Sequence, residues 1–227
     1  MINYSYTNGI ATIHFDDGKA NVFSVESVAA MQEALDRAEQ EAKALVWRGR
    51  KGQFSAGFDL KVIQAGDSAK SKAQLLAGFE VLCRLFNYPL PVVTVSAGHA
   101  IGMGAFLLLS ADIRIALDAP CKIGLPETAI AMPFDPELLM IIARERVNPQ
   151  HYRTAILHSR MHQPSEAKEA GFLDIVVAGE KLDATVAGVT TQLTQLPSEQ
   201  YAINKKQLLA HIANDLQTNL DQFRSNS

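Results

Sequence analysis

Apolar and polar residues alternate at the start of the chain and then change to a helical period. The segment "YSYTNGIATIHF" alternates on both sides of Asn8-Gly9, a pair typical of a two-residue type I′ turn between antiparallel strands. The next segment, "VESVAAMQEALDRAEQEAKA", places apolar residues three and four positions apart. This spacing predicts an amphipathic helix with Ser24 as its N-cap. "ALVWRG" then reads as a short buried strand.

Strands and helices continue to alternate in the middle of the chain. We expect a helix over about residues 70–87, because the prolines of "YPLP" disfavour helix in the residues that precede them. The β-branched run "VVTVSA" predicts a strand, residues 104–111 a short helix after a turn at Gly98, and "DIRIA" a returning strand. Strands and helices in this order indicate an α/β fold.

From Pro133 onward the pattern is mainly helical. "DPELLMIIARERV", "PQHYRTAIL" and "PSEAKEAG" are expected helical segments, the last with Ser165 as its cap and Gly171 at its end. A strand, "LDIVV", and two terminal helices follow. We therefore expect an α/β core over residues 1–180 and a helical C-terminal extension over residues 181–227.

Composition and charge exclude several classes of partner. The 227 residues are 48% hydrophobic with a formal net charge of -3, which gives a sizeable core but no basic surface for nucleic acid or anionic membranes. Cys83 and Cys121 lack metal or redox spacing, so we expect reduced core thiols, as in a cytoplasmic protein. The N-terminus has no signal-peptide pattern, and glycines and polar residues break the most apolar stretch, residues 92–116, which disfavours a membrane span.

A cluster of glycines in "GHAIGMGAF" suggests either close packing or a binding turn. It has neither the dinucleotide-loop spacing nor the Lys-Ser/Thr of a P-loop, and the chain has no G-x-S-x-G elbow or metal-spaced histidine pair. The lone His99 is expected to be packed or hydrogen-bonded rather than catalytic. Backbone N–H groups at the start of the following helix can hold an oxyanion. "FSAGFDL" forms a second such turn, with an exposed amide near Ala56-Gly57.

Four segments stand in the order and spacing typical of one enzyme superfamily: "GQFSAGFDL", "VVTVSAGHAIGMGAFLLLSADIRIA", "IGLPET" and "PSEAKEAGFLDIVV". Over about residues 1–180 the chain resembles the crotonase, or enoyl-CoA hydratase/isomerase, superfamily. The resemblance implies a spiral of repeated β-β-α units, assembled as a homotrimer or a dimer of trimers. It also implies that the helical C-terminal extension takes part in trimerisation and closes the pocket. It also implies an acyl-CoA thioester as substrate, with coenzyme A as part of that substrate and no separate cofactor or metal.

The same resemblance assigns roles to the two turns. By motif position, the backbone N–H groups of Ala56 and Met103 would bind the thioester oxygen and stabilise an enolate, each lowering the barrier by about 3 kcal/mol. Glycines beside these donors would let the thioester approach the backbone. The implied substrate contacts are Gly57, Phe58, Lys61, Gly102, Gly104 and Phe106. Lys61 and either Lys205 or Lys206 are candidates for the phosphates of coenzyme A, whereas Asp59 is expected to fix its turn.

Hydratases of this family use two glutamates, and only one of them is matched here. The first position is Phe106, which can neither exchange a proton nor hold a water molecule. The second is Glu127, whose expected apolar neighbours Phe106, Ile130 and Met132 would raise its pKa. A single base can move a proton from C2 to C4 of a 3-enoyl thioester. The sequence therefore favours a Δ3-Δ2 enoyl-CoA isomerase with Glu127 as its base.

Two other functions stay open. In "AMPFDPELLM", Asp135 or Glu137 could replace the missing acid and restore hydration or another enolate reaction, such as decarboxylation or thioester hydrolysis. Capping of the following helix is the other role open to these two acids. The third function is acyl-CoA binding without catalysis, because a fold does not fix an activity.

Overall fold

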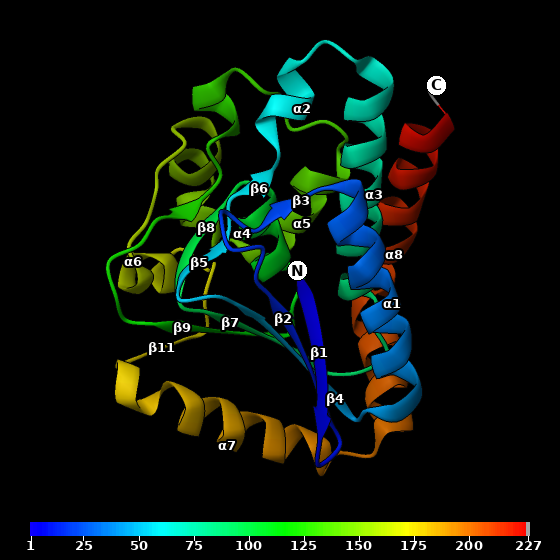
Figure 1. The fold of residues 1–227 in the computed structure, drawn as a ribbon, viewed down its shortest axis with the longest axis vertical. Coiled ribbons are helices and arrows are strands. Elements are labelled where there is room, and N and C mark those ends of the chain that lie inside the picture. The colour runs from blue at the N-terminus through cyan, green and yellow to red at the C-terminus, as the bar shows by residue number, and fades with distance from the viewer. Residues whose placement is uncertain (226–227) are drawn as a thin grey trace.

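The computed structural model describes residues 1–225 and contains two main sheets (Figure 1). The large sheet has the strand order β1-β2-β4-β7-β9-β11, and the small sheet has the order β10-β8-β5. Three strands of the large sheet are each followed along the chain by a strand of the small sheet: β4 (Ala44–Gly49) by β5 (Gly52–Ser55), β7 (Val92–Ser96) by β8 (Gly98–Ile101), and β9 (Ile113–Leu117) by β10 (Ile123–Gly124). A helical segment follows each pair. This is the expected spiral of β-β-α units.

The N-terminal hairpin forms as predicted. β1 (Ile2–Thr7) and β2 (Ile10–Phe15) pair antiparallel, with Thr7 opposite Ile10. Asn8 and Gly9 have φ of 53° and 81°, the positive values that a type I′ turn requires at both central residues. The other neighbours in the large sheet pair parallel, ending with β11 (Ile175–Val177) on β9.

Helices cover both faces of the large sheet. The α-helices of the described residues are α1 (Val25–Glu41), α2 (Leu60–Gln64), α3 (Ser68–Phe86), α4 (Met103–Leu109), α5 (Leu138–Arg146), α6 (Pro164–Glu169), α7 (Leu182–Thr194) and α8 (Ser198–Ser225). Short helical turns lie at η1 (Glu127–Ile130), η2 (Pro149–His151), η3 (Arg153–Leu157) and η4 (Gly179–Lys181), and β3 (Val22–Phe23) pairs with β6 (Gly57–Phe58). Ser24 caps α1 by accepting a hydrogen bond from the Ser27 N–H, as predicted. None of the helices in residues 1–225 is both long and apolar enough to span a membrane.

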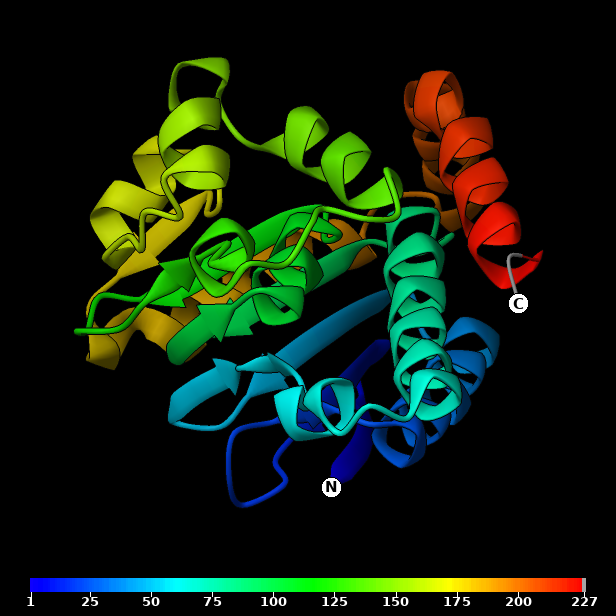
Figure 2. The same cartoon turned by 90° about the horizontal axis from the view of Figure 1, so that it is seen from above.

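The large sheet separates two hydrophobic clusters. Figures 1 and 2 show α1, α3 and α8 side by side on one face, while α7 lies on the other. Leu45 and Trp47 of β4 belong to the main core, whereas Val46 joins the smaller cluster beneath α7. A central parallel strand is buried on both faces, which explains why "ALVWRG" reads as a continuous apolar run. Leu209, Leu216 and Leu220 bring α8 into the main core.

Some local expectations were wrong. α6 begins at Pro164 with Gln163 as its N-cap, so Ser165 lies inside the helix instead of capping it; proline is preorganised for the first helical position. "PQHYRTAIL" is helical as predicted, but as the 3-10 helix η2 followed by the π-helix η3 and not as one α-helix. Gly171, with φ of 89°, does follow the end of α6, and the thiols of Cys83 and Cys121 are both buried and free.

Candidate active site

Two turns that follow strands of the small sheet meet at the start of α4. A Cβ atom on Gly57 would lie 2.9 Å from the Ile101 carbonyl oxygen and 3.0 Å from the Met103 backbone nitrogen. A Cβ atom on Gly104 would lie only 2.2 Å from the Ser55 carbonyl oxygen. Any side chain at either position would force the turns apart. The glycines therefore allow the close approach that brings the two motifs together.

Met103 supplies an available amide in this junction. It is the first residue of α4, so its N–H has no acceptor one turn earlier in the helix. The neighbouring Gly102 N–H donates to the Gly124 carbonyl oxygen at 3.0 Å, and the Phe106 N–H donates to the Gly102 carbonyl oxygen at 3.0 Å. Within residues 1–225, no acceptor is bonded to the Met103 N–H. Its position at the start of a helix suits a donor to a bound oxyanion.

Ala56 does not supply the second amide. Its N–H donates to the Ala20 carbonyl oxygen at 2.9 Å, and the following Gly57 N–H donates to Ser55 Oγ at 3.0 Å. The backbone of the neighbouring loop therefore already uses the Ala56 N–H, which corrects its expected role as an oxyanion donor. The next amide in this turn belongs to Phe58.

Asn21, which the sequence analysis missed, holds this turn in place. It is fully buried in the left-handed region, with φ of 53°. Its Nδ2 group contacts the carbonyl oxygens of Phe15, Gln53 and Phe54 at 2.7, 3.2 and 3.1 Å. Its own carbonyl oxygen accepts a hydrogen bond from Ser55 Oγ at 2.7 Å. Asn21 thus links the loop after β2 to the Ser55–Gly57 turn, and the turn-forming run "DDGKAN" was the signal available in the sequence.

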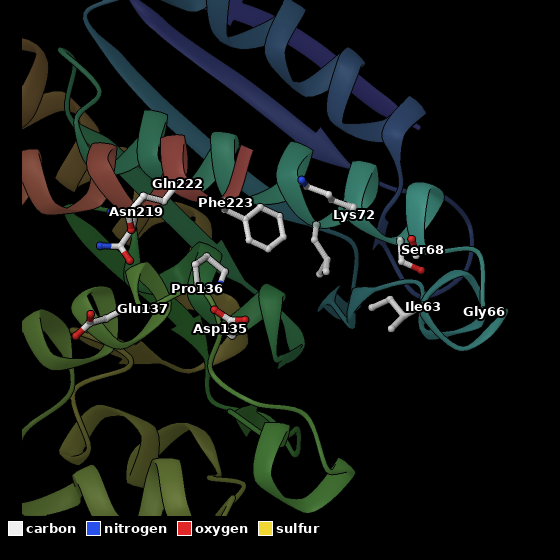
Figure 3. Close-up of a pocket in the computed structure, with 12 residues that line it drawn as sticks. Ile63, Gly66, Ser68, Lys72, Asp135, Pro136, Glu137, Asn219, Gln222 and Phe223 are labelled. Carbon is white, nitrogen blue, oxygen red and sulfur yellow. The ribbon is translucent and has the colours of Figure 1, made fainter. Parts of the chain in front are cut away.

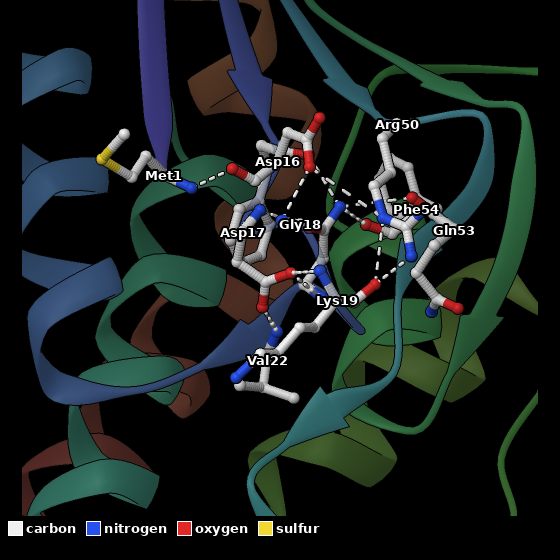
Figure 4. Close-up of polar contacts among 11 residues, drawn as sticks. Met1, Asp16, Asp17, Gly18, Lys19, Val22, Arg50, Gln53 and Phe54 are labelled. Carbon is white, nitrogen blue, oxygen red and sulfur yellow. Dashed lines mark hydrogen bonds and ion pairs between the residues drawn. The ribbon is translucent and has the colours of Figure 1, made fainter.

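The loop that carries Asn21 is itself fixed by polar contacts (Figure 4). The Asp17 carboxylate accepts hydrogen bonds from the backbone N–H groups of Lys19, Asn21 and Val22. Burial alone would raise the pKa of Asp17, but these hydrogen bonds lower it below its ordinary value. Arg50 Nε donates to the Lys19 carbonyl oxygen at 2.9 Å. The loop is therefore built to support the turn on which it packs.

Glu127 places a buried carboxyl group beside the Met103 turn. It begins η1 and is 8% exposed. A Cβ atom on Gly102 would lie 3.3 Å from Glu127 Oε1, and among the described residues Glu127 Oε2 has no hydrogen-bond partner. Burial raises the pKa of Glu127 to about 7. An unpaired buried acid is costly to the fold, which makes it a strong candidate for a chemical role.

Glu127 lines an apolar space of about 200 Å³, which we call the inner cavity. Asp135 is the other acid in its wall, and the remaining lining residues are Phe58, Leu75, Phe79, Met103, Phe106, Met132, Pro133, Leu139 and Phe223. The expected neighbours Phe106 and Met132 are therefore present. Ile130 is not, because it is 44% exposed on the outside of η1. Phe223 comes from α8, within the C-terminal extension that was expected to close the pocket, although the residue itself was not predicted.

Among the remaining candidate residues, Lys61 is exposed and the others make structural contacts. Asp59 caps α2 by accepting a hydrogen bond from the Lys61 N–H at 3.0 Å, as predicted, and the Lys61 side chain is exposed. Lys205 is 7% exposed, and its Nζ donates to Asp112 Oδ2 at 2.7 Å. Its expected contact with coenzyme A is therefore wrong, because this buried ion pair fixes α8 to the core. His99 Nδ1 accepts a hydrogen bond from the Lys122 N–H, the structural role expected of it.

Comparisons with known proteins identify the family to which this fold belongs. The family model for enoyl-CoA hydratase/isomerase matches residues 5–226. A solved structure of an enoyl-CoA hydratase/isomerase family protein from Pseudomonas syringae is 31% identical, with a TM-score of 0.93, and the match covers 98% of this chain and 96% of that chain.

Two further structures come from Mycobacterium tuberculosis. One, a probable enoyl-CoA hydratase, is 31% identical with a TM-score of 0.93 and coverage of 99% of this chain and 95% of that chain. The other is an apo structure of the same protein, named there an enoyl-CoA isomerase; it is 31% identical with a TM-score of 0.92, and the match covers 100% of this chain and 98% of that chain. Both names occur among similar structures, so similarity alone does not decide between the two reactions. The chain belongs to the enoyl-CoA hydratase/isomerase family.

Proposed function

We propose that this protein is a Δ3-Δ2 enoyl-CoA isomerase in which Glu127 is the single acid–base group. The observation that carries the proposal is the Glu127 carboxyl group, which lies buried in an apolar cavity beside the available Met103 amide, with Oε2 unpartnered among the described residues. A pKa of about 7 gives this group both protonation states near neutral pH. General acid–base catalysis works best when the pKa of the catalytic group lies near the working pH.

The thioester oxygen would bind between the N–H groups of Met103 and Phe58. Phe58 replaces Ala56 in this role because the N–H groups of Ala56 and Gly57 both have acceptors within the protein. Gly57 lies against the Met103 nitrogen, and Phe58 and Met103 both line the inner cavity. Two amides that converge on one oxygen would stabilise the negative charge of an enolate more strongly than that of the neutral thioester.

The reaction then needs two proton transfers by the same carboxyl group. The Glu127 carboxylate removes a proton from C2 of the 3-enoyl thioester, and the electron pair moves into the carbonyl group to give a dienolate. The protonated Glu127 returns the proton to C4, the electron pair of the oxygen reforms the carbonyl group, and the double bond lies between C2 and C3. The two proton transfers consume no water. No separate cofactor is required, since coenzyme A is part of the substrate.

Phe106 supports isomerisation because it fills the position of the first of the two hydratase glutamates. Its ring is 1% exposed and packs edge-on against Phe134, with centroids 6.4 Å apart. A phenyl ring there leaves no group to orient an attacking water molecule. Its bulk also keeps the inner cavity apolar around the C2–C4 region of the substrate.

Hydration remains the second candidate because Asp135 lines the same cavity as Glu127. Asp135 is exposed, so it would reach the substrate from the open side of the cavity. Glu137 lines a different pocket farther out. Of the two acids named from the sequence, only Asp135 is therefore a candidate to replace the carboxylate missing at Phe106.

The coenzyme A end of the substrate would lie outside the inner cavity. Lys61, exposed on α2 just after Phe58, would contact the phosphates of coenzyme A. We expect a homotrimer or a dimer of trimers, which light scattering would measure.

Assays with two substrates test the reaction. Purified protein is incubated with 3-hexenoyl-CoA, and the conjugated 2-enoyl thioester is followed by its absorbance; a parallel sample with crotonyl-CoA reports hydration as a loss of that absorbance. We expect isomerisation with little hydration. Hydration as the main reaction would overturn the proposal in favour of Asp135, and binding of both thioesters without turnover would indicate a non-catalytic acyl-CoA binder.

A further inference from the structure

Glu127 lies between two parts of the chain that are fixed in different ways. On its N-terminal side, β10 pairs with β8, the strand that leads into the Met103 turn, and the Gly102 N–H donates to the Gly124 carbonyl oxygen. On its C-terminal side, η1 is one short helical turn in which residues 128–130 are all exposed. So short a helical segment is not stable on its own. Contacts with another segment must therefore hold the turn that begins at Glu127.

η1 lacks a cap from its own sequence. Its N-cap position is Pro126, which makes no side-chain capping hydrogen bond. The Ala129 N–H is the third in the turn, one of the groups that an N-cap side chain ordinarily bonds. Ser159 Oγ, thirty residues farther along the chain, accepts this N–H at 3.0 Å. A distant residue thus supplies the cap that the local sequence does not.

η3 is completed by η1 in the same way. Ile156 lies in the last turn of η3, where carbonyl groups have no helical N–H beyond them. Thr128 Oγ1 donates to the Ile156 carbonyl oxygen at 2.9 Å. The two segments therefore cap each other, because Ser159 bonds the start of η1 and Thr128 bonds the end of η3.

The backbone of Ser159 is held in an uncommon conformation. Its φ of 49° lies in the left-handed region, which glycine adopts at little cost and other residues seldom adopt. Residues of this kind persist where the surrounding structure fixes them, and they cluster at functional sites. A glycine here could not bond the Ala129 N–H, so the hydroxyl group gives a reason for serine at this position.

The segment 153–162 also contacts the chain on the other side of Glu127. The His162 N–H donates to the Ile123 carbonyl oxygen at 2.9 Å, and the Ile123 N–H donates to the His162 carbonyl oxygen at 3.0 Å. Glu127 Oε2 itself has no hydrogen-bond partner in the part of the chain that the structure describes. The direction of the carboxyl group therefore depends on the backbone that carries it.

We infer that Thr128 and Ser159 are positioning residues of the active site, which hold the Glu127 backbone so that its carboxyl group stays in the inner cavity beside the Met103 amide. Neither residue lines the inner cavity, so both act through Glu127 and not on the substrate. The inference rests on the proposed function, because it takes Glu127 as the group that transfers the proton.

Removing both hydroxyl groups tests the inference. In the double variant Thr128→Val, Ser159→Ala, kcat for 3-hexenoyl-CoA should fall about tenfold or more, since a small misplacement of a catalytic group can cost about a hundredfold in rate. The Kd of hexanoyl-CoA should stay within about twofold of wild type, because the lining of the cavity is unchanged.

Two single variants are the matched controls. Thr128→Ser keeps the hydroxyl group and should retain the wild-type kcat. Thr154→Val removes a hydroxyl group of the same segment that donates to the His151 carbonyl oxygen and not to η1. It should also retain the wild-type kcat.

Titration of Glu127 gives a second readout that needs no turnover. ¹³C NMR of protein labelled at the glutamate carboxyl carbons, with the signal assigned by Glu127→Gln, measures the pKa directly. Burial raises this pKa to about 7 in the wild type. In the double variant the carboxyl group should reach water, and its pKa should fall by about one unit or more towards the ordinary value. Partial unfolding alone would weaken the signal without moving the pKa of the folded protein.

The possible outcomes separate this inference from the proposed function. The inference requires both the fall in kcat and the lower pKa in the double variant. A wild-type value of either, or an equal loss of kcat in Thr154→Val, would overturn it even if the wild type isomerises 3-hexenoyl-CoA. If the wild type does not isomerise this substrate, the proposed function is wrong, and the pKa alone then decides whether the two hydroxyl groups position Glu127.

Discussion

Glu127 and Asp135 are two carboxyl groups on one connecting segment, and both line the inner cavity, yet their surroundings differ completely. Glu127 is buried, Oε2 has no partner in residues 1–225, and burial raises its pKa to about 7. Asp135 is exposed and also lines the neighbouring space of about 720 Å³ that Figure 3 shows. A position in the cavity wall therefore does not by itself make a carboxyl group reactive. Removal from water, next to a backbone donor, is what suits Glu127 to proton transfer.

Replacing Glu127 should have the largest effect. Glu127→Gln keeps the shape of the side chain but removes its proton transfer, so we expect kcat for 3-hexenoyl-CoA to fall by about a thousandfold or more. The Kd of hexanoyl-CoA should change little, which separates lost chemistry from lost folding. Substantial isomerisation by this variant would exclude Glu127 as the base.

Removing the Met103 N–H should cost nearly as much. Met103→Pro removes this backbone donor, together with the Met103 side chain that lines the inner cavity, at the first position of α4, where helices tolerate proline. We expect kcat to fall by about 10²–10³, the usual effect of losing one oxyanion donor. Met103→Leu, which keeps the N–H and an apolar side chain, is the matched control and should remain within a few-fold of wild type. Equal losses in both variants would mean that the side chain, not the amide, matters.

The raised pKa of Glu127 predicts opposite trends for activity and stability. The base must be ionised, so kcat/KM should rise about tenfold per pH unit below pH 7 and level off above it. The folded-state pKa lies above the ordinary value of 4.5, so the proton stabilises the fold. That contribution is fully present below about pH 4.5 and is lost as the pH rises through 7. From pH 5 to 8 the Tm of the wild type should therefore fall by several degrees relative to Glu127→Gln, as thermal denaturation at each pH would show.

Asn21 should affect kcat through the turn that it supports. Asn21→Gly retains the freedom to adopt a positive φ but loses the three contacts of Nδ2, so we expect kcat to fall about tenfold with a smaller change in KM. Ser55→Ala, which removes the hydroxyl between Asn21 and Gly57, should act in the same direction. A change in Tm alone, with normal kcat at low temperature, would limit Asn21 to a structural role.

Asp135→Asn should have the smallest effect. We expect less than about a twofold change in the isomerisation of 3-hexenoyl-CoA, because Asp135 is exposed and transfers no proton in the proposed reaction. A large loss of activity, above all of hydration, would show that Asp135 acts as the acid that is missing at Phe106. Glu127 would then not be the single acid–base group.

The sequence predicted the features that depend on local pattern. The hairpin at Asn8-Gly9, the Ser24 cap, the long helices and the strand "ALVWRG" follow from turn chemistry and hydrophobic periodicity. β3, β6 and β10 have two residues each and are too short to produce a period. Their existence depends on pairing between segments that are distant in the chain.

The candidate site was predictable only in part. The resemblance located the two turns and Glu127, and the structure brings them together. It could not show that the Ala56 N–H is bonded to Ala20 or that Lys205 is paired with Asp112, because both partners come from distant segments. Phe223 enters the inner cavity from the last helix, a contact that only tertiary packing creates.

The most direct test of the account follows the proton itself. 3-Hexenoyl-CoA deuterated at C2 is converted by the wild type in ordinary water, and the 2-enoyl product is examined by mass spectrometry and NMR before back-reaction. If Glu127 alone removes and returns the proton, part of the label should appear at C4, with the rest lost by exchange from the carboxyl group. A product that carries no deuterium at C4, formed at an undiminished rate by Glu127→Gln, would contradict the single-base mechanism.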